Sequence, residues 1–249
     1  MDRESEKQCK MFSTTNSRNN HPEWLTSFME HKGITIWGAA DLRGFPTPAD
    51  QKDRCFEYAV AWIIPMNPEI MKSIKNGPNQ KYADEYARAN ALINSLANAL
   101  VAEIRSRGSN ALMLPASVRT DTKGMKGEFP HKTAATRAGL GWIGKHCQLI
   151  TREYGPWVRL GTVFTDMKLP CRTPIEKELC GKCTQCVEAC PANALKGSAW
   201  APGIPREQII DVFACDRWKK ENYMQFHKGH NCGICSSVCP YGLKVIKEG

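Results

Sequence analysis

The chain has 249 residues, a hydrophobic share of 42% and a formal net charge of +9. No apolar run approaches the length of a membrane-spanning helix, and residues 1–20 contain no apolar signal-peptide stretch. These features exclude a membrane-spanning or signal-bearing chain of the usual kind and predict a soluble, cytoplasmic protein with no membrane partner. The basic residues are scattered, which favours a solvated basic surface over a dense nucleic-acid site.

The first third of the chain mixes helix and strand signals. Residues 1–20 are polar and are expected to be disordered. Residues 21–33 are predicted to form a short helix that ends at a glycine. Strands are predicted over 34–40 and 58–64, separated by a loop over 41–53 and followed by a second loop over 67–79.

The strongest helix signal is a run of apolar residues at steps of three and four, from Tyr82 to Ile104. After it we expect a strand at 111–115, and a long polar loop at 117–129 of the kind that often has a function. The rest of this region is predicted to be a helix over 131–140 and a hairpin of strands 147–151 and 157–165. Without strict strand–helix–strand alternation, residues 21–170 are predicted to form an α+β domain.

Residues 171–249 are predicted to form a separate ferredoxin-like domain, because they contain most of the cysteines. Cys180 to Pro191 has the spacing C-x2-C-x2-C-x3-C-P, which is typical of two-cluster bacterial ferredoxins. A second run, from Cys232 to Pro240, lacks one cysteine of this motif, and Cys215 is the remaining cysteine of the tail that can replace it.

The spacing predicts two [4Fe-4S] clusters, because in this motif the cysteine before the proline binds the neighbouring cluster. Zinc also binds C-x2-C pairs, but it does not explain the third cysteine or the proline. A disulfide framework is disfavoured because nothing marks the chain as secreted. We assign one cluster to Cys180, Cys183, Cys186 and Cys239, and the other to Cys190, Cys215, Cys232 and Cys235.

The second informative stretch is a glycine-rich segment upstream of the cysteines. Three glycines between positions 139 and 144 allow the backbone to approach another group closely. The string also matches G-x-G-x-x-G, but it follows a predicted helix and precedes a predicted strand, whereas a dinucleotide site needs the reverse order. NAD binding is therefore disfavoured.

This segment, the strands that follow it and the cysteine tail with its displaced Cys215 resemble the epoxyqueuosine reductases and, more distantly, the reductive dehalogenases. The resemblance implies a nitroreductase-like α+β domain that binds cobalamin beside two [4Fe-4S] clusters. The clusters of that family pass electrons to cobalt, which then drives a reductive reaction. The resemblance also implies that the segment near the cobalamin comprises Gly139, Leu140, Gly141, Trp142, Ile143, Gly144 and Lys145.

The chain differs from that family at two points. The family's acidic proton donor falls at Met125 in this register, and the nearest candidate acid is Asp121, which needs a shifted loop. The family also continues into a helical-repeat region that helps to bind tRNA, whereas this sequence ends at Gly249. The titratable candidates for proton delivery are Asp121, His131 and Lys132. Their ordinary roles would be a turn cap, a helix-start histidine and a solvated lysine.

We therefore expect an iron–sulfur oxidoreductase with cobalamin as second cofactor and a reduced ferredoxin or flavodoxin-type protein as electron donor. The substrate stays open, with tRNA as one possibility. Two alternatives also remain open. The chain could reduce cobalamin for another enzyme, or it could be a ferredoxin-type carrier without a substrate of its own.

Overall fold

The computed structural model describes residues 21–49 and 55–245, so the predicted disorder of residues 1–20 lies outside the described residues. A four-stranded antiparallel sheet forms the centre of the molecule, with strand order β1-β2-β6-β3. Its strands are β1 (Trp37–Asp41), β2 (Tyr58–Pro65), β3 (Ala111–Met113) and β6 (Val158–Thr165). The α+β class predicted from the sequence is thus confirmed.

Both faces of the sheet are covered, as strand β2 demonstrates. Val60, Trp62 and Ile64 pack into one apolar cluster, whereas Ala59, Ala61 and Ile63 pack into a second cluster. Successive side chains of a strand point to opposite faces, so a strand with two buried faces is apolar throughout. The sequence of β2 is apolar for this reason.

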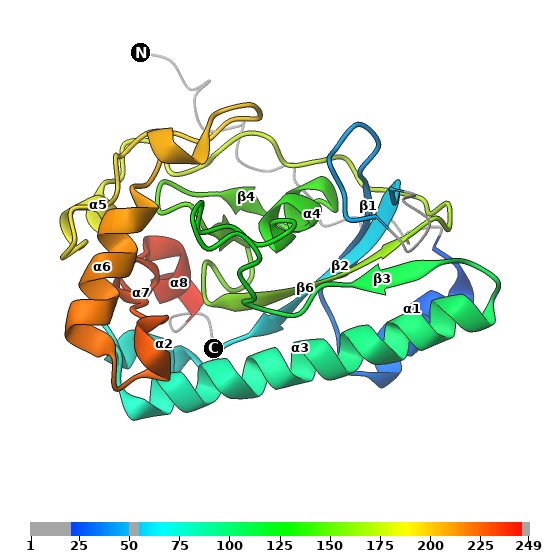
Figure 1. Cartoon of the computed structure of the whole chain (residues 1–249), viewed down its shortest axis with the longest axis horizontal. Coiled ribbons are helices and arrows are strands. Elements are labelled where there is room, and N and C mark those ends of the chain that lie inside the picture. Colours follow the sequence, from blue (N-terminus) through cyan, green and yellow to red (C-terminus); the bar gives the residue numbers. More distant parts are fainter. Residues whose placement is uncertain (1–20, 50–54, 246–249) are drawn as a thin grey trace, which may run out of the picture.

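Helices α1 (Glu23–His31) and α3 (Gln80–Ser106) cover one face, and α4 (His131–Arg137) covers the other. Figure 1 shows α3 running along the length of the sheet, with α4 on the opposite side. Helix α3 begins where the side chain of Asn79 accepts a hydrogen bond of 3.0 Å from the backbone N–H of Tyr82. Its apolar stripe lies against the sheet, as the periodicity predicted.

Two sequence-based expectations are wrong. The segment predicted as a loop over 67–79 contains helix α2 (Pro68–Ser73), whose first N–H groups are capped by the Asn67 side chain. The predicted hairpin does not form either. Strand β5 (Leu149–Ile150) pairs with β4 (Trp142–Ile143), whereas β6 enters the main sheet between β2 and β3. The turn itself forms, with backbone hydrogen bonds of 2.9 Å and 3.1 Å between Thr151 and Gly155, but the strands on its two sides pair with other strands.

The cysteine-rich segment consists of short helices joined by turns, and it lies at one end of the sheet (Figure 1). The indole N–H of Trp157, just before β6, donates a hydrogen bond of 2.8 Å to the carbonyl of Ser236. The helices are α5 (Gln185–Glu188), η1 (Arg206–Gln208), α6 (Val212–Tyr223), η2 (His227–Gly229), α7 (Ile234–Ser237) and α8 (Pro240–Val245).

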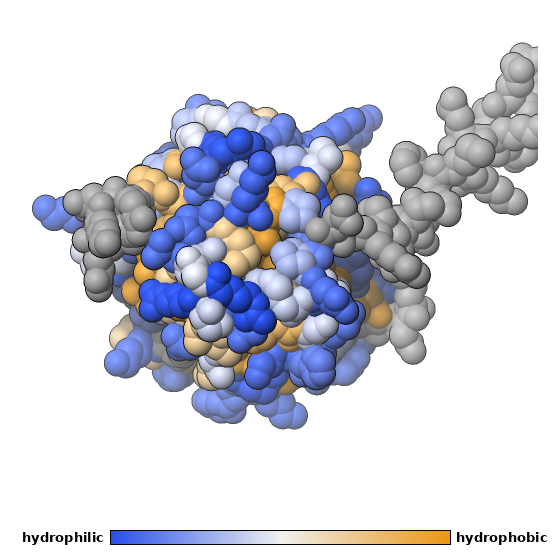
Figure 2. Space-filling model, turned by 90° about the vertical axis from the view of Figure 1, so that its right-hand side faces the viewer, coloured by the Kyte–Doolittle hydropathy of each residue, from blue (hydrophilic) through white to orange (hydrophobic). Residues whose placement is uncertain are grey.

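The surface of the opposite end of the molecule is mainly hydrophilic, with small apolar areas between polar side chains (Figure 2). Among the described residues, none of the helices has the length and apolar character needed to span a bilayer. The described exposed large apolar side chains include Leu92, Val118 and Leu243, which come from separate parts of the chain.

Candidate functional site

The eight tail cysteines line two cavities, four in each. The larger cavity, of about 430 Å³, is lined by Cys190, Cys215, Cys232 and Cys235. The smaller cavity, of about 250 Å³, is lined by Cys180, Cys183, Cys186 and Cys239. This division coincides with the two ligand sets predicted from the spacing.

Electrostatic interactions between the thiols follow the same division. Burial raises the pKa of Cys186 to about 11, and the next causes are the neighbouring thiols of Cys239, Cys180 and Cys183. Burial also raises the pKa of Cys232, with Cys215 and Cys190 among its neighbours. The two groups approach each other at Cys186 and Cys235. Burial raises the pKa of Cys235, and the thiol of Cys186, from the smaller cavity, is among the further causes.

Each cavity is surrounded by four of the tail cysteines, which is the number of thiolates that a [4Fe-4S] cluster takes. Zinc holds thiolates about 2.3 Å from one centre, which gathers them tightly. A four-iron cluster is wider, so it fits four thiols that surround a cavity.

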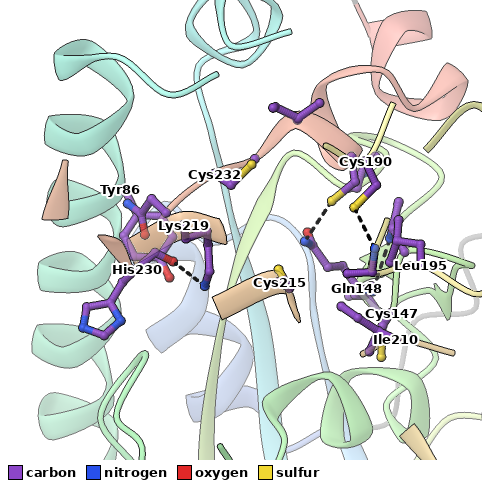
Figure 3. Close-up of a pocket in the computed structure, with 18 of the residues that line it drawn as sticks. Tyr86, Cys147, Gln148, Cys190, Leu195, Ile210, Cys215, Lys219, His230 and Cys232 are labelled. Atoms are coloured by element: carbon purple, nitrogen blue, oxygen red, sulfur yellow. Dashed lines mark hydrogen bonds between the residues drawn. The ribbon is translucent and has the colours of Figure 1, made fainter. Parts of the chain in front are cut away.

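Backbone and amide groups already point toward the sulfur atoms of the larger cavity. Figure 3 shows Cys190, Cys215 and Cys232 around a common space, with Gln148 beside it. The amide of Gln148 donates to Cys235 Sγ at 3.7 Å, and the backbone N–H of Ala194 donates to Cys190 Sγ at 3.4 Å. Such N–H groups stabilise the negative charge of thiolates and tune a bound cluster.

The larger cavity extends beyond the cysteines to a wall formed by α3, the start of α4 and β6. This wall includes Tyr86, His131, Lys132, Cys147 and Arg159. Two of its residues are cationic, and no described Asp or Glu lines the cavity. The wall is therefore suited to an occupant that has a negative charge.

Two side chains of this wall are held by neutral partners. Lys132 Nζ donates to the carbonyl of Cys147 at 2.6 Å and to its Sγ at 3.1 Å. The Arg159 guanidinium donates to Asn90 Oδ1 at 3.0 Å and lies 4.0 Å from the centre of the Tyr86 ring. Neither cation is neutralised by a carboxylate in the described ion pairs.

Two of the three histidines that line the larger cavity, His131 and His146, are uncharged at neutral pH. Burial lowers the pKa of His131 to about 4, with Arg159 as the second cause. Burial lowers the pKa of His146 to about 4 as well, with Lys132 as the second cause. His131 Nδ1 lies 3.0 Å from the hydroxyl of Thr162, which holds the ring in place.

The glycine-rich segment lies against the smaller group of cysteines. Lys145 Nζ donates to the carbonyls of Gly181 at 2.7 Å and Cys183 at 3.2 Å. A Cβ atom on Gly141 would lie 2.2 Å from the carbonyl oxygen of Ile150, so glycine is needed there for close backbone packing. Of the predicted residues 139–145, Lys145 lines the smaller cavity, and none lines the larger one.

Asp121 is not among the residues that line either cavity. Its carboxylate caps a turn by accepting the backbone N–H of Gly124 at 2.7 Å. Arg206 fixes the same loop by donating to the carbonyls of Gly124 at 2.9 Å and Met125 at 3.0 Å. In this arrangement the loop holds Asp121 away from His131 and Lys132, which do line the larger cavity.

Sequence reasoning missed several residues of the larger cavity. His146, Cys147, Gln148 and Arg159 are not among the site residues predicted from the sequence. The first three follow the glycine-rich segment directly, so that extending the motif by three residues could have found them. Arg159 lies in a strand and gave no comparable signal.

Comparison with known proteins identifies the cysteine-rich segment. Residues 179–242 match the family described as "4Fe-4S double cluster binding domain". The epoxyqueuosine reductase of Listeria monocytogenes is 38% identical over 117 residues, which cover 46% of this chain and 30% of that protein. The Synechocystis enzyme is 36% identical over 130 residues, covering 49% of this chain and 42% of that protein.

Solved structures show the same fold over a larger part of the chain. A reductive dehalogenase, described with a mechanism for B12-dependent dehalogenation, has a TM-score of 0.66 and 19% identity, covering 88% of this chain and 31% of that chain. An epoxyqueuosine reductase with an epoxyqueuosine-modified tRNA-Tyr stem loop has a TM-score of 0.58 and 18% identity, covering 88% and 65%.

The chain is thus a double-cluster iron–sulfur protein with the fold of these two groups of reductases. About half of its sequence is related to the epoxyqueuosine reductases, as predicted from the motifs. It spans less than half of the length of the curated relatives named above.

Proposed function

We propose that this protein is an oxidoreductase that passes electrons through two [4Fe-4S] clusters to a cobalamin in the larger cavity for a reductive reaction. The observation behind this proposal is that one cavity joins four cysteines to a wall of Tyr86, Lys132 and Arg159. A cluster and a second redox group in the same cavity would be direct neighbours, which is what electron delivery requires.

The cysteines are the proposed cluster ligands, in two sets of four. Their mutual arrangement around two cavities and the match to a double-cluster domain both support this role. The smaller cavity has Cys180, Cys183, Cys186 and Cys239, and the larger has Cys190, Cys215, Cys232 and Cys235. The first set receives electrons and the second delivers them, because only the second shares a cavity with the cationic wall.

The wall suits a large cofactor with apolar faces and a charged group. Apolar side chains of Leu149, Val158 and Leu160 line the cavity together with Lys132 and Arg159. The Arg159 guanidinium would bind the phosphate of a cobalamin, as charge complementarity favours. When bound, cobalamin supplies the low-potential cobalt that performs the reduction. Residues 139–145 would support this wall from behind, by holding residues 146–149 in position.

Lys132 is the best placed of the three proposed proton donors. Its ammonium group lines the larger cavity, whereas the lowered pKa of His131 leaves that ring unprotonated at neutral pH. Asp121 needs a movement of the 117–129 loop to reach the cavity, because its carboxylate caps a turn there. We therefore propose Lys132 as the donor and keep Asp121 and His131 as alternatives.

The proposed substrate follows from the relatives. An epoxyqueuosine-modified tRNA is the first substrate to test, because two related enzymes have that name and a structure of the same fold contains such a tRNA stem loop. A reduced ferredoxin or flavodoxin-type protein is the proposed electron donor.

The test is an anaerobic titration of the iron-loaded protein with cobalamin, followed by its visible spectrum. A base-off spectrum at stoichiometric cobalamin is expected. Arg159→Gln should weaken binding, and Lys126→Gln, in an exposed turn, serves as the control. Absence of binding would favour the ferredoxin-type carrier. Turnover of epoxyqueuosine-modified tRNA then separates an enzyme from a protein that reduces cobalamin for another enzyme.

A further inference from the structure

His146 lies between the two cysteine-lined cavities. It is the one described residue that lines both of them. The side chain is only 2% exposed, so it faces the cavities and not solvent. Each cavity is lined by four of the tail cysteines, so this imidazole lies between the two sets of proposed ligands.

The hydrogen bonds of the ring determine which nitrogen has the proton. The backbone N–H of Gln148 donates to His146 Nδ1 at 3.2 Å. An acceptor Nδ1 in a neutral imidazole leaves the proton on Nε2. His146 Nε2 is buried and has no hydrogen-bond partner among the described residues.

A buried N–H without an acceptor is unfavourable, and native proteins rarely leave one. The backbone holds this one in place, because Cys147 N–H donates to the Gly144 carbonyl at 2.8 Å and Gly144 N–H donates to the Gln148 carbonyl at 3.0 Å. Both cavities are rich in sulfur, which accepts hydrogen bonds when it is a thiolate or a cluster sulfide. The missing acceptor of Nε2 is therefore a sulfur atom.

We propose that His146 Nε2 donates a hydrogen bond to a sulfur of one [4Fe-4S] cluster and thereby sets the difference in potential between the two clusters. This inference rests on the proposed function, which supplies the two clusters. A reduced cluster has one more negative charge than the oxidised cluster, so the hydrogen bond stabilises the reduced form. His146 is thus a positioning residue for electron transfer and not a proton donor.

The test is a redox titration of the whole iron-loaded protein, followed by electron paramagnetic resonance. His146→Phe keeps a ring but removes Nε2–H. We expect about eight iron atoms per chain, as in wild type, and a more negative potential for one cluster. A tenfold change in its reduced-to-oxidised ratio corresponds to about 59 mV for one electron. His146→Gln, which has an amide donor, should restore part of the shift.

Trp218→Phe is the matched control. The indole N–H of Trp218 is also buried and has no hydrogen-bond partner among the described residues. Unlike His146, Trp218 lines only the larger of the two cavities. This variant should shift only the cluster that Cys215→Ser removes. Unchanged potentials in His146→Phe, with full iron content, would overturn the role of His146. Iron loss in both His146 variants would also overturn it, since it indicates a structural role. About four iron atoms in the wild type would instead contradict the proposed function.

Discussion

The two cysteine-lined cavities differ in what surrounds their sulfur atoms. The smaller cavity has its cysteines beside Lys145, Tyr241 and Lys244, and most of its lining comes from the cysteine segment itself. The larger cavity joins its cysteines to residues of the central sheet and its helices. A site enclosed by its own motif is suited to relaying electrons, whereas a reaction needs room beyond the sulfur atoms. Under the proposed function, the smaller cavity is therefore the relay and the larger cavity is the reaction site.

The largest expected effect comes from removing one cysteine of either group. Cys215→Ser should lower the iron content from about eight to about four per chain and abolish turnover, because a cluster needs four thiolates. Cys180→Ser should also halve the iron content. Cys171→Ser serves as control, since this half-buried thiol lines neither cavity. Iron analysis measures all three variants, and full iron in Cys215→Ser would contradict the assignment.

A second test compares one lysine from each cavity, Lys132 of the larger and Lys145 of the smaller. Lys132→Gln should keep full iron but lower turnover by about 10²- to 10⁴-fold, the usual contribution of a proton donor. The pH dependence of the residual turnover should change as well. Lys145→Gln should instead reduce iron content, because its ammonium holds the loop of Gly181 and Cys183. Equal effects of both changes on turnover at full iron content would remove the distinction between the cavities.

A third prediction concerns acid stability at the wall of the larger cavity. Because the folded-state pKa of His131 is about 4, below its ordinary 6.5, the unfolded chain binds more protons between these values. The free energy of unfolding should therefore fall by roughly 3 kcal/mol as the pH drops through this window. Anaerobic urea unfolding measures the change. His131→Gln should show a smaller loss, and an identical loss would place the effect elsewhere.

The smallest expected effect belongs to Asp121. Asp121→Asn weakens the cap of an exposed turn, which should cost at most about 1 kcal/mol of stability. Turnover with a saturating electron donor should change less than about twofold if Lys132 delivers the proton. A large loss of turnover in a folded, fully iron-loaded variant would instead favour Asp121 as the donor, after movement of its loop.

Much of the architecture could be predicted because its causes are local. The apolar run of β2 and the stripe of α3 record burial directly, so both elements were found. The prediction of a hairpin was wrong because the pairing of strands depends on contacts between residues that are distant in sequence. Strand β6 pairs with β2 and β3 instead of β5. Helix α2 was missed although Asn67-Pro68 is a good helix start.

The sequence by itself determined that eight cysteines form two sets of four, because ligand spacing is a property of the chain. Only the tertiary structure decided what each set faces. The glycine-rich segment lies behind the smaller set, and the three residues after it, His146, Cys147 and Gln148, reach the larger cavity. The wall with Lys132 and Arg159 is assembled from α4 and β6, which are distant in sequence. Spacing cannot encode such a surface, since it arises when separate elements pack together.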